Sequence, residues 1–173
     1  MEKHIAARSK NEMESNDLAR IRAQKEHAQF FYDLEWRRSD SLAKKAGMII
    51  TANGVFMAAS SFLFGELIPT TINWLIVALP ILCFILSLFS AISALILLKY
   101  DLPSKPDEFN AWANDKTEYD AVKKSLDDYT LCSNTFLDNN NETVKKLLNS
   151  LLTFVAGGIL LALLIFSAVV GYV

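Results

Sequence analysis

Four basic side chains, Arg37, Arg38, Lys44 and Lys45, stand immediately before an apolar run at residues 46–64. Guanidinium and ammonium groups bind phosphate oxygens and attract anions, so the cluster fits a site for a phosphate-bearing ligand or the mouth of an anion-conducting pore. It also fits a membrane anchor, because long Lys and Arg side chains reach the lipid head groups from a helix end. Anchoring accounts for the cluster by itself, and the two roles are compatible.

An amide side chain, Asn53, lies inside this apolar run, and Ser60 follows it one heptad later on the same helical face. A polar side chain in hydrocarbon seeks a hydrogen-bond partner, and such bonds between membrane helices contribute about 0.6 to 2 kcal/mol. Two hypotheses follow for this pair. It either bonds a neighbouring helix or lines a water-filled path.

Small and weakly polar residues form a similar stripe in a second apolar run at residues 72–98. The stripe consists of Cys83, Ser87, Ser90 and Ala94. Small residues let helix backbones approach closely, so the stripe indicates tight packing, although a pore wall has the same pattern. In a third run at residues 147–173, two pairs have small-xxx-small spacing and predict a helix contact: Gly158 with Ala162, and Ser167 with Gly171.

The residues that carry most enzyme chemistry are scarce and scattered. Both histidines, His4 and His27, lie in polar segments and are expected to be solvated. Cys83 and Cys132 offer neither a disulfide framework nor metal-ligand spacing. The sequence therefore predicts that the protein is not an enzyme, holds no metal and uses no cofactor.

Three apolar runs must position the polar groups. Residues 46–64, 72–98 and 147–173 contain no Asp, Glu, Lys or Arg, and the whole chain is 52% apolar. At 1.5 Å per residue a helix over each run is long enough to cross a bilayer core of about 30 Å. A soluble helical bundle seldom keeps such long charge-free helices. We predict an all-α, polytopic membrane protein with three transmembrane helices.

The basic residues predict the orientation of these helices. Ten of the 17 Lys and Arg residues lie in residues 1–45, and the other seven lie in residues 99–146. By the positive-inside rule both segments are cytoplasmic and the C-terminus lies on the outer face.

Two cytoplasmic helical arms complete the predicted architecture. After a flexible tail at residues 1–14, a helix is expected over 15–45, capped by the polar cluster at 15–17 and continuing into the first span. The second arm, residues 99–146, has a turn containing Pro103 and a helix that starts near Pro106. The run Asn139–Asn141 either breaks this helix or lies within one continuous helix into the third span, and we favour the continuous helix. These arms are too small for a separate enzyme domain.

The order of arm, span, short loop, span, arm and span resembles the small membrane effectors of bacterial anti-phage operons. The matching residues are SDSLAKKAGMIITANG, from Ser39 to Gly54, and more loosely RIRAQKEHAQFFYDLEWR, from Arg20 to Arg37. The likeness is to the Pycsar transmembrane effectors and the SLATT-type effectors, and the third span favours the Pycsar pattern. It implies a bacterial inner-membrane location, a nearby nucleotidyltransferase and a nucleotide or oligonucleotide signal.

Three functions are compatible with these observations. The leading hypothesis is a homo-oligomeric channel, with a tetramer as one candidate assembly, whose arms sense the signal. Its pore would be lined by Asn53 and Ser60, or by Ser87 and Ser90, and Arg37, Arg38, Lys44 and Lys45 would stand at its mouth or bind the ligand. The alternatives are a non-conducting adaptor that anchors a soluble partner, and a holin-like lesion former without ligand control.

Overall fold

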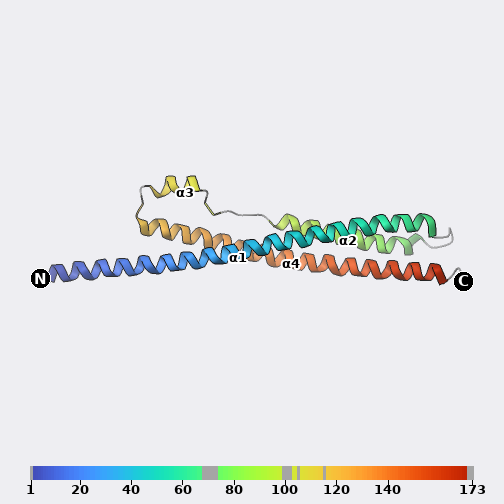
Figure 1. The fold of residues 1–173 in the computed structure, drawn as a ribbon, viewed down its shortest axis with the longest axis horizontal. Coiled ribbons are helices and arrows are strands. Elements are labelled where there is room, and N and C mark those ends of the chain that lie inside the picture. The colour runs from blue at the N-terminus through green and yellow to red at the C-terminus, as the bar shows by residue number, and fades with distance from the viewer. Residues whose placement is uncertain (1, 68–73, 99–102, 105, 115, 171–173) are drawn as a thin grey trace. The chain divides into compact units, whose positions relative to one another are not determined.

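The computed structural model of the protein describes the backbone of residues 2–67, 74–98, 103–104, 106–114 and 116–170. It describes the side chains of residues 15–62, 78–98, 103–104, 107–114, 116–168 and 170. Within these residues every regular element is an α-helix, which confirms the predicted all-α class. The helices are α1 (Glu2–Leu67), α2 (Trp74–Leu97), α3 (Pro106–Ala113) and α4 (Glu118–Val170) (Figure 1).

Helix α1 is continuous from Glu2 to Leu67 and starts earlier than the predicted start at residue 15. Residues 2–45 contain neither Pro nor Gly, and good helix formers such as Ala, Arg, Glu and Lys fill most of these positions. The helix passes from the polar segment into the apolar run without a break, as the sequence predicts.

The second arm is divided where one helix was expected. Helix α3 begins with Pro106, followed by Asp107 and Glu108, and ends at Ala113. Thr117 then caps α4, because its Oγ1 accepts a hydrogen bond from the backbone N–H of Asp120 at 3.2 Å. From there α4 runs unbroken through Asn139–Asn141, so the continuous-helix alternative is confirmed.

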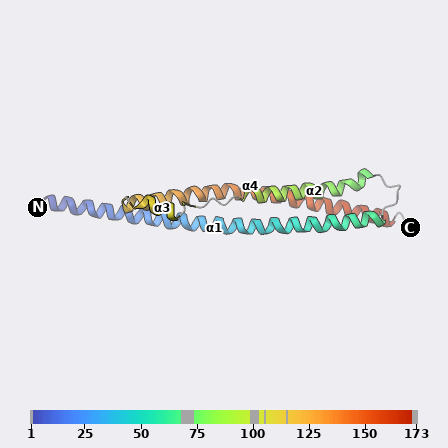
Figure 2. The same cartoon turned by 90° about the horizontal axis from the view of Figure 1, so that it is seen from above.

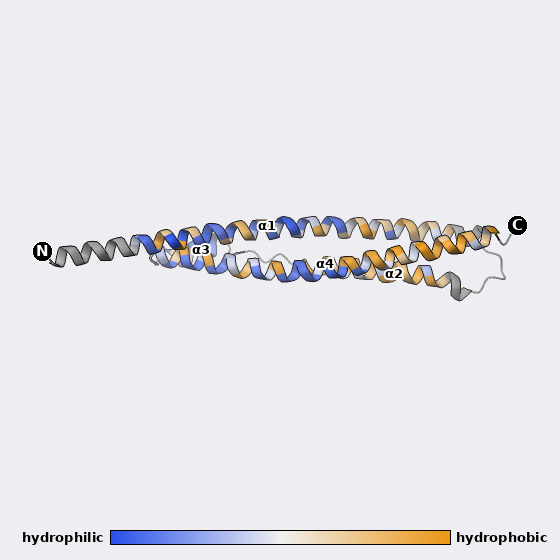
Figure 3. Cartoon of the chain, turned by 90° about the horizontal axis from the view of Figure 1, so that it is seen from below, coloured by the Kyte–Doolittle hydropathy of each residue, from blue (hydrophilic) through white to orange (hydrophobic). Residues whose placement is uncertain are grey.

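The chain forms two compact units, and α1 and α4 each contribute to both. Unit 1 combines Met1–Arg38 with Tyr100–Asp138, and unit 2 combines Ser39–Lys99 with Asn139–Val173. Figure 3 shows that polar residues predominate in the described part of unit 1, whereas apolar residues predominate on α2 and on the α4 segment of unit 2.

Unit 1 is held by an aromatic cluster between α1 and α4. Tyr32 of α1 is 8% exposed and packs against Cys132 and Phe136 of α4. The ring of Tyr32 lies 5.6 Å from Tyr129 and 5.5 Å from Phe136. Ring centroids at these distances, with the planes steeply inclined, match the preferred arrangement of aromatic pairs.

Other contacts of unit 1 fix the direction of α4 and the place of α3. Arg22 forms an ion pair with Glu118, so α1 and α4 run in the same direction within the unit, because Tyr32 meets Tyr129 further along both helices. Helix α3 lies beside the first turns of α4, where the ammonium of Lys124 is 5.4 Å from the Trp112 ring centroid (Figure 2).

Unit 2 is a bundle of three helices, in which α2 is antiparallel to α1 and α4. Its buried residues recur at spacings of three and four, the pattern of helices packed side by side. They are Ser39, Leu42, Ala46, Asn53 and Ser60 on α1; Pro80, Phe84, Ser87, Ala91, Ala94 and Leu98 around α2; and Asn140, Thr143, Leu147, Ser150, Gly157, Leu161 and Leu164 on α4.

These residues form successive layers along the bundle. One apolar layer joins Ala46 of α1, Ala94 of α2 and Leu147 of α4. Another contains one phenylalanine from each helix, Phe56, Phe84 and Phe154, whose ring centroids are 5.1–5.8 Å apart. A polar layer lies between the two.

Two helices in the described part of the chain are long and apolar enough to cross a membrane. They are Ala78–Leu97 and a segment within Glu118–Ala168, both with a peak mean hydropathy of 2.5. These correspond to the second and third predicted spans. The first predicted span, residues 46–64, lies within α1, and its residues 63 and 64 lie outside the described side chains.

Candidate functional site

The polar layer of unit 2 joins Asn53, Ser87 and Ser150, one residue from each of the three helices. All three side chains are fully buried. The Nδ2 of Asn53 donates hydrogen bonds to the backbone oxygen of Ile49 at 2.9 Å and to the Oγ of Ser87 at 3.0 Å. The predicted preference of Asn53 for a partner on another helix is therefore met within one chain.

Two serines connect α2 and α4 in the same layer. The Oγ of Ser87 donates to the backbone oxygen of Ser150 at 2.8 Å, and the Oγ of Ser150 donates to the backbone oxygen of Ser87 at 2.7 Å. The small side chains bring the two backbones close enough for this exchange. One turn nearer the start of the α4 segment, Ser90 donates to the backbone oxygen of Lys146 at 2.8 Å.

One polar atom of the layer is not satisfied by a hydrogen bond. The Oδ1 of Asn53 is buried and has no hydrogen-bond partner within the described part of the chain. Turning the amide by 180° would not remove this unsatisfied group. The Nδ2 lies beside the backbone oxygen of Ile49 and the Oγ of Ser87, and an amide oxygen in its place would repel the Ile49 carbonyl. An unsatisfied buried amide group costs about 1–3 kcal/mol, which the other hydrogen bonds of the layer and the packing around it must offset.

The predicted pore-lining residues differ in their surroundings. Asn53, Ser60 and Ser87 are fully buried inside one chain, and Ser90 is half-buried against α4. The Oγ of Ser60 donates to the backbone oxygen of Phe56 in its own helix at 2.6 Å. Bonding between helices, one of the two hypotheses for these residues, accounts for their contacts within the chain. Their role in a pore stays a prediction.

The predicted small-xxx-small contact in the third run is at a different glycine. A Cβ on Gly157 would lie 3.0 Å from the Cβ of Cys83 and 3.0 Å from a ring carbon of Phe84, so this glycine is where α4 meets α2. A Cβ on Gly158 would have no neighbour within 4 Å, and Ala162 is exposed. Gly171 lies outside the described residues.

The four basic residues fall into two classes. Lys44 pairs with Asp40 at 2.6 Å, and this hydrogen-bonded carboxylate raises the pKa of Lys44; Arg38 pairs with Glu35 at 3.4 Å. Arg37 and Lys45 are exposed and make no ion pair within the described residues. Two of the four therefore have all their donors available to a ligand or a head group.

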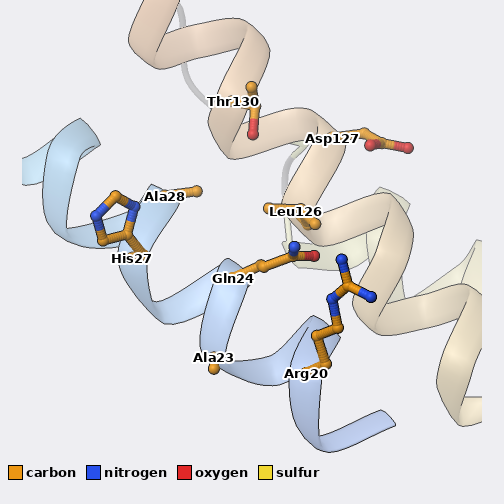
Figure 4. Close-up of a pocket in the computed structure, with 8 residues that line it drawn as sticks. All are labelled: Arg20, Ala23, Gln24, His27, Ala28, Leu126, Asp127 and Thr130. Carbon is orange, nitrogen blue, oxygen red and sulfur yellow. The ribbon is translucent and has the colours of Figure 1, made fainter. Parts of the chain in front are cut away.

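A groove between α1 and α4 in unit 1 is a second candidate site (Figure 4). It consists of two adjoining hollows of about 620 and 360 Å³ that share His27, Ala28 and Thr130. In Figure 4 the side chains of Arg20 and Gln24 extend from α1 toward α4, while the carboxylate of Asp127 points away from them at the rim.

Sequence reasoning missed Ser150 and the groove. The spacing Asn140, Thr143, Leu147, Ser150 alternates three and four and would have placed Ser150 on the buried face of α4. The groove has no comparable signal, because its residues come from two helices whose relative register a single sequence does not give.

Comparisons with known proteins give no further assignment. No family model, no curated protein and no solved structure matches this chain. Among the described residues, no group of three or more His, Cys, Asp or Glu could hold a metal ion.

Proposed function

We propose that the protein is a three-span membrane effector that assembles as a homo-oligomer and conducts ions when a nucleotide or oligonucleotide signal reaches its cytoplasmic arms. The signal would come from a partner nucleotidyltransferase in anti-phage defence, as in the effectors that the sequence resembles. The spans are residues 46–64, 72–98 and 147–173, with the N-terminus cytoplasmic in a bacterial inner membrane.

Exposed apolar surface supports the membrane location. Only 28% of the apolar window of α2 and 17% of that of α4 are buried in the chain, whereas the core helix of a soluble protein is mostly buried. Large side chains such as Phe89, Leu152 and Phe166 are 59–73% exposed. Water would make this surface costly, and lipid tails would cover it at no such cost.

Basic side chains at one end of unit 2 support the orientation. Lys44 and Lys45 of α1 lie just before the first span, and Lys145 and Lys146 of α4 lie just before the third. The two pairs stand at the same level, because Ala46 and Leu147 share a layer. Lysines at that end suit the cytoplasmic head-group region.

The observation that carries the proposed conduction is the buried Asn53–Ser87–Ser150 layer with its unsatisfied oxygen. Three packed helices fill their own centre, so a hydrated path needs several chains around an axis. We propose that the described arrangement is the closed state and that opening turns this layer toward the axis. Water would then satisfy the Oδ1 of Asn53, which lowers the free energy of the open state relative to the closed one.

Ion flux into liposomes containing the purified protein tests this proposal. Asn53→Leu should abolish flux while insertion and oligomerisation persist. Ser61→Leu is the matched control, because Ser61 lies on the exposed side of α1 and bonds its own helix at the backbone oxygen of Met57. Lost flux in the Ser61 variant alone would place the pore wall on the other face of α1.

The adaptor is the second candidate, because the hydrogen bonds among Asn53, Ser87 and Ser150 hold the three helices of a chain together, as a static anchor requires. It predicts no flux from wild-type protein that is shown to be oligomeric, under any nucleotide tested. Periplasmic reporter activity after residue 173 would support the proposed orientation in either case.

A further inference from the structure

The groove of unit 1 has two walls of different chemistry. The α1 wall carries Arg20 and Gln24 in the larger hollow, and Phe31 and Glu35 in the smaller one, where Glu35 pairs with Arg38. The α4 wall carries the carboxylate of Asp127 and the hydroxyl of Thr130 in the larger hollow, and Ser133 and Asn134 in the smaller one. Arg20 and Asp127 make no ion pair with each other or with any other described residue, although charged groups of the same unit, such as Arg22 and Glu118, are paired.

Apolar side chains are exposed along the same groove. Phe31 of α1 is 45% exposed and Leu137 of α4 is 41% exposed, and both line the smaller hollow. The imidazole of His27 stacks against Phe31 with ring centroids 4.7 Å apart. A pair of helices with this much exposed apolar surface between them has an incomplete core, and further helices would complete it.

We propose that the groove binds the same groove of a second copy, so that two arms form a parallel four-helix bundle. This inference rests on the proposed function, because two copies inserted in the same direction place equal heights of their arms side by side. A twofold axis along the helices then sets the α1 wall of each copy against the α4 wall of the other. Each Arg20 then faces the wall of the other copy that carries Asp127.

Charge complementarity favours a second copy of the chain as the partner that binds this groove. In the larger hollow the charged group of the α1 wall is Arg20 and that of the α4 wall is Asp127, so this part of the groove is complementary to itself under the twofold rotation. The parallel course of α1 and α4 within unit 1 makes this possible, since a rotation about an axis along these helices keeps the direction of both walls. Phe31 and Leu137 then lie in the interior of the four-helix bundle.

Two single substitutions test the pairing between copies. In the larger hollow, Arg20→Asp puts a carboxylate on both walls, and Asp127→Arg puts a guanidinium on both. Each should associate poorly with itself, while the two together restore opposite charges at both contacts. Co-purification of differently tagged full-length chains from detergent should favour the mixed pair over either self-pair on the order of tenfold at low salt, and high salt should reduce the preference.

A photo-crosslinking probe at two consecutive positions tests the location. Replacing Phe31 by p-benzoylphenylalanine puts the probe in the groove, whereas replacing Phe30, which is 58% exposed and does not line the described hollows, puts it outside. The Phe31 probe should give an adduct of twice the 19.4 kDa chain in membranes. The Phe30 probe should give much less.

The outcomes separate this inference from the proposed function. If wild-type chains oligomerise and conduct, but mixing shows no preference and neither probe gives a double-mass adduct, copies associate elsewhere and the groove assignment is wrong. An adduct with a different protein would overturn it too, in favour of a heterologous partner. If the mixed pair forms and no flux is found, the arm dimer stands and the channel fails. Circular dichroism of each variant checks that the helices are retained.

Discussion

Ser87 of α2 and Ser150 of α4 each donate a hydroxyl hydrogen bond to the other's backbone oxygen, at 2.8 and 2.7 Å. The exchange holds two apolar helices together at one register, because a shift of either helix along its axis breaks both bonds at once. Asn53 of α1 joins it by donating to the Oγ of Ser87. A single polar layer therefore sets the register of all three helices, as polar residues at core positions do in coiled coils.

Removing one half of this exchange should weaken the bundle moderately. Ser150→Ala is expected to lower the free energy of unfolding by about 0.5–2 kcal/mol, the range for hydrogen bonds between membrane helices. Adding Ser87→Ala should cost less than the sum of the two single changes, because the residues form one network. Unfolding in mixed detergent micelles measures both. Ser61→Ala, at an exposed serine, should stay within about 0.5 kcal/mol of wild type.

Adjacent glycines of α4 should respond in opposite directions to the same substitution. Gly157→Ala places a methyl group 3.0 Å from the Cβ of Cys83 and from a ring carbon of Phe84, so these side chains must shift by a few tenths of an ångström. Because Phe84 is fully buried, we expect a cost of about 1–3 kcal/mol. Gly158→Ala meets nothing within 4 Å and gains up to about 1 kcal/mol in helix propensity. The same unfolding assay compares them. Equal effects would mean that Gly157 is not at the contact within the chain, or that Gly158 contacts another copy.

Asn140 and Thr117 show how far the sequence predicts this fold. Asn139–Asn141 reads as a helix breaker by propensity, yet Asn140 is buried in α4 and accepts a hydrogen bond from the Oγ of Ser39 at 2.7 Å. A tertiary contact overrides a weak local preference there. The start of α4 shows the reverse, because the cap at Thr117 is a local signal that apolar spacing alone does not reveal.

The candidate site could be predicted only in part. Asn53 and Ser87 are identifiable because polar groups in apolar runs need partners, but their pairing depends on the register between helices, which periodicity does not give. The same limit explains why Gly158 was expected at a contact that Gly157 makes. Periodicity identifies a face to within about 100°, the rotation between adjacent residues.

Alkaline pH should loosen unit 1 through Tyr32. Burial raises the pKa of Tyr32 above its ordinary value of 10.0, and Cys132, Tyr129 and Asp33 add to the shift. The hydroxyl is therefore harder to ionise in the folded chain than in the unfolded chain. Its contribution to the free energy of unfolding is intact below pH 10.0, and that free energy falls as the pH rises above this value. Helix content followed by circular dichroism should fall with pH in wild type and fall less steeply in Tyr32→Phe.

Tyr119→Phe is the control for this titration, because Tyr119 is 41% exposed and is not part of the aromatic cluster around Tyr32. A wild-type curve that matches the Tyr32→Phe curve would show that other groups govern alkaline unfolding.

The two unpaired basic residues should matter more for ligand binding than the two paired ones. Arg37 and Lys45 are exposed and make no ion pair within the described residues, whereas Arg38 and Lys44 are engaged by Glu35 and Asp40. Replacing Arg37 and Lys45 with Gln, or Arg38 and Lys44 with Gln, removes two positive charges in either case. Long-range attraction of anions and the orientation in the membrane should therefore change equally in the two variants.

If the basic residues bind a phosphate-bearing signal, the variant at Arg37 and Lys45 loses donors that were free. Its affinity for a labelled oligonucleotide should fall about tenfold, as expected for the loss of one or two charge-assisted hydrogen bonds. The second variant should fall less, because its donors are already shared with carboxylates. Equal losses would reduce the cluster to a non-specific basic surface, and no loss in either variant would leave it as a membrane anchor alone.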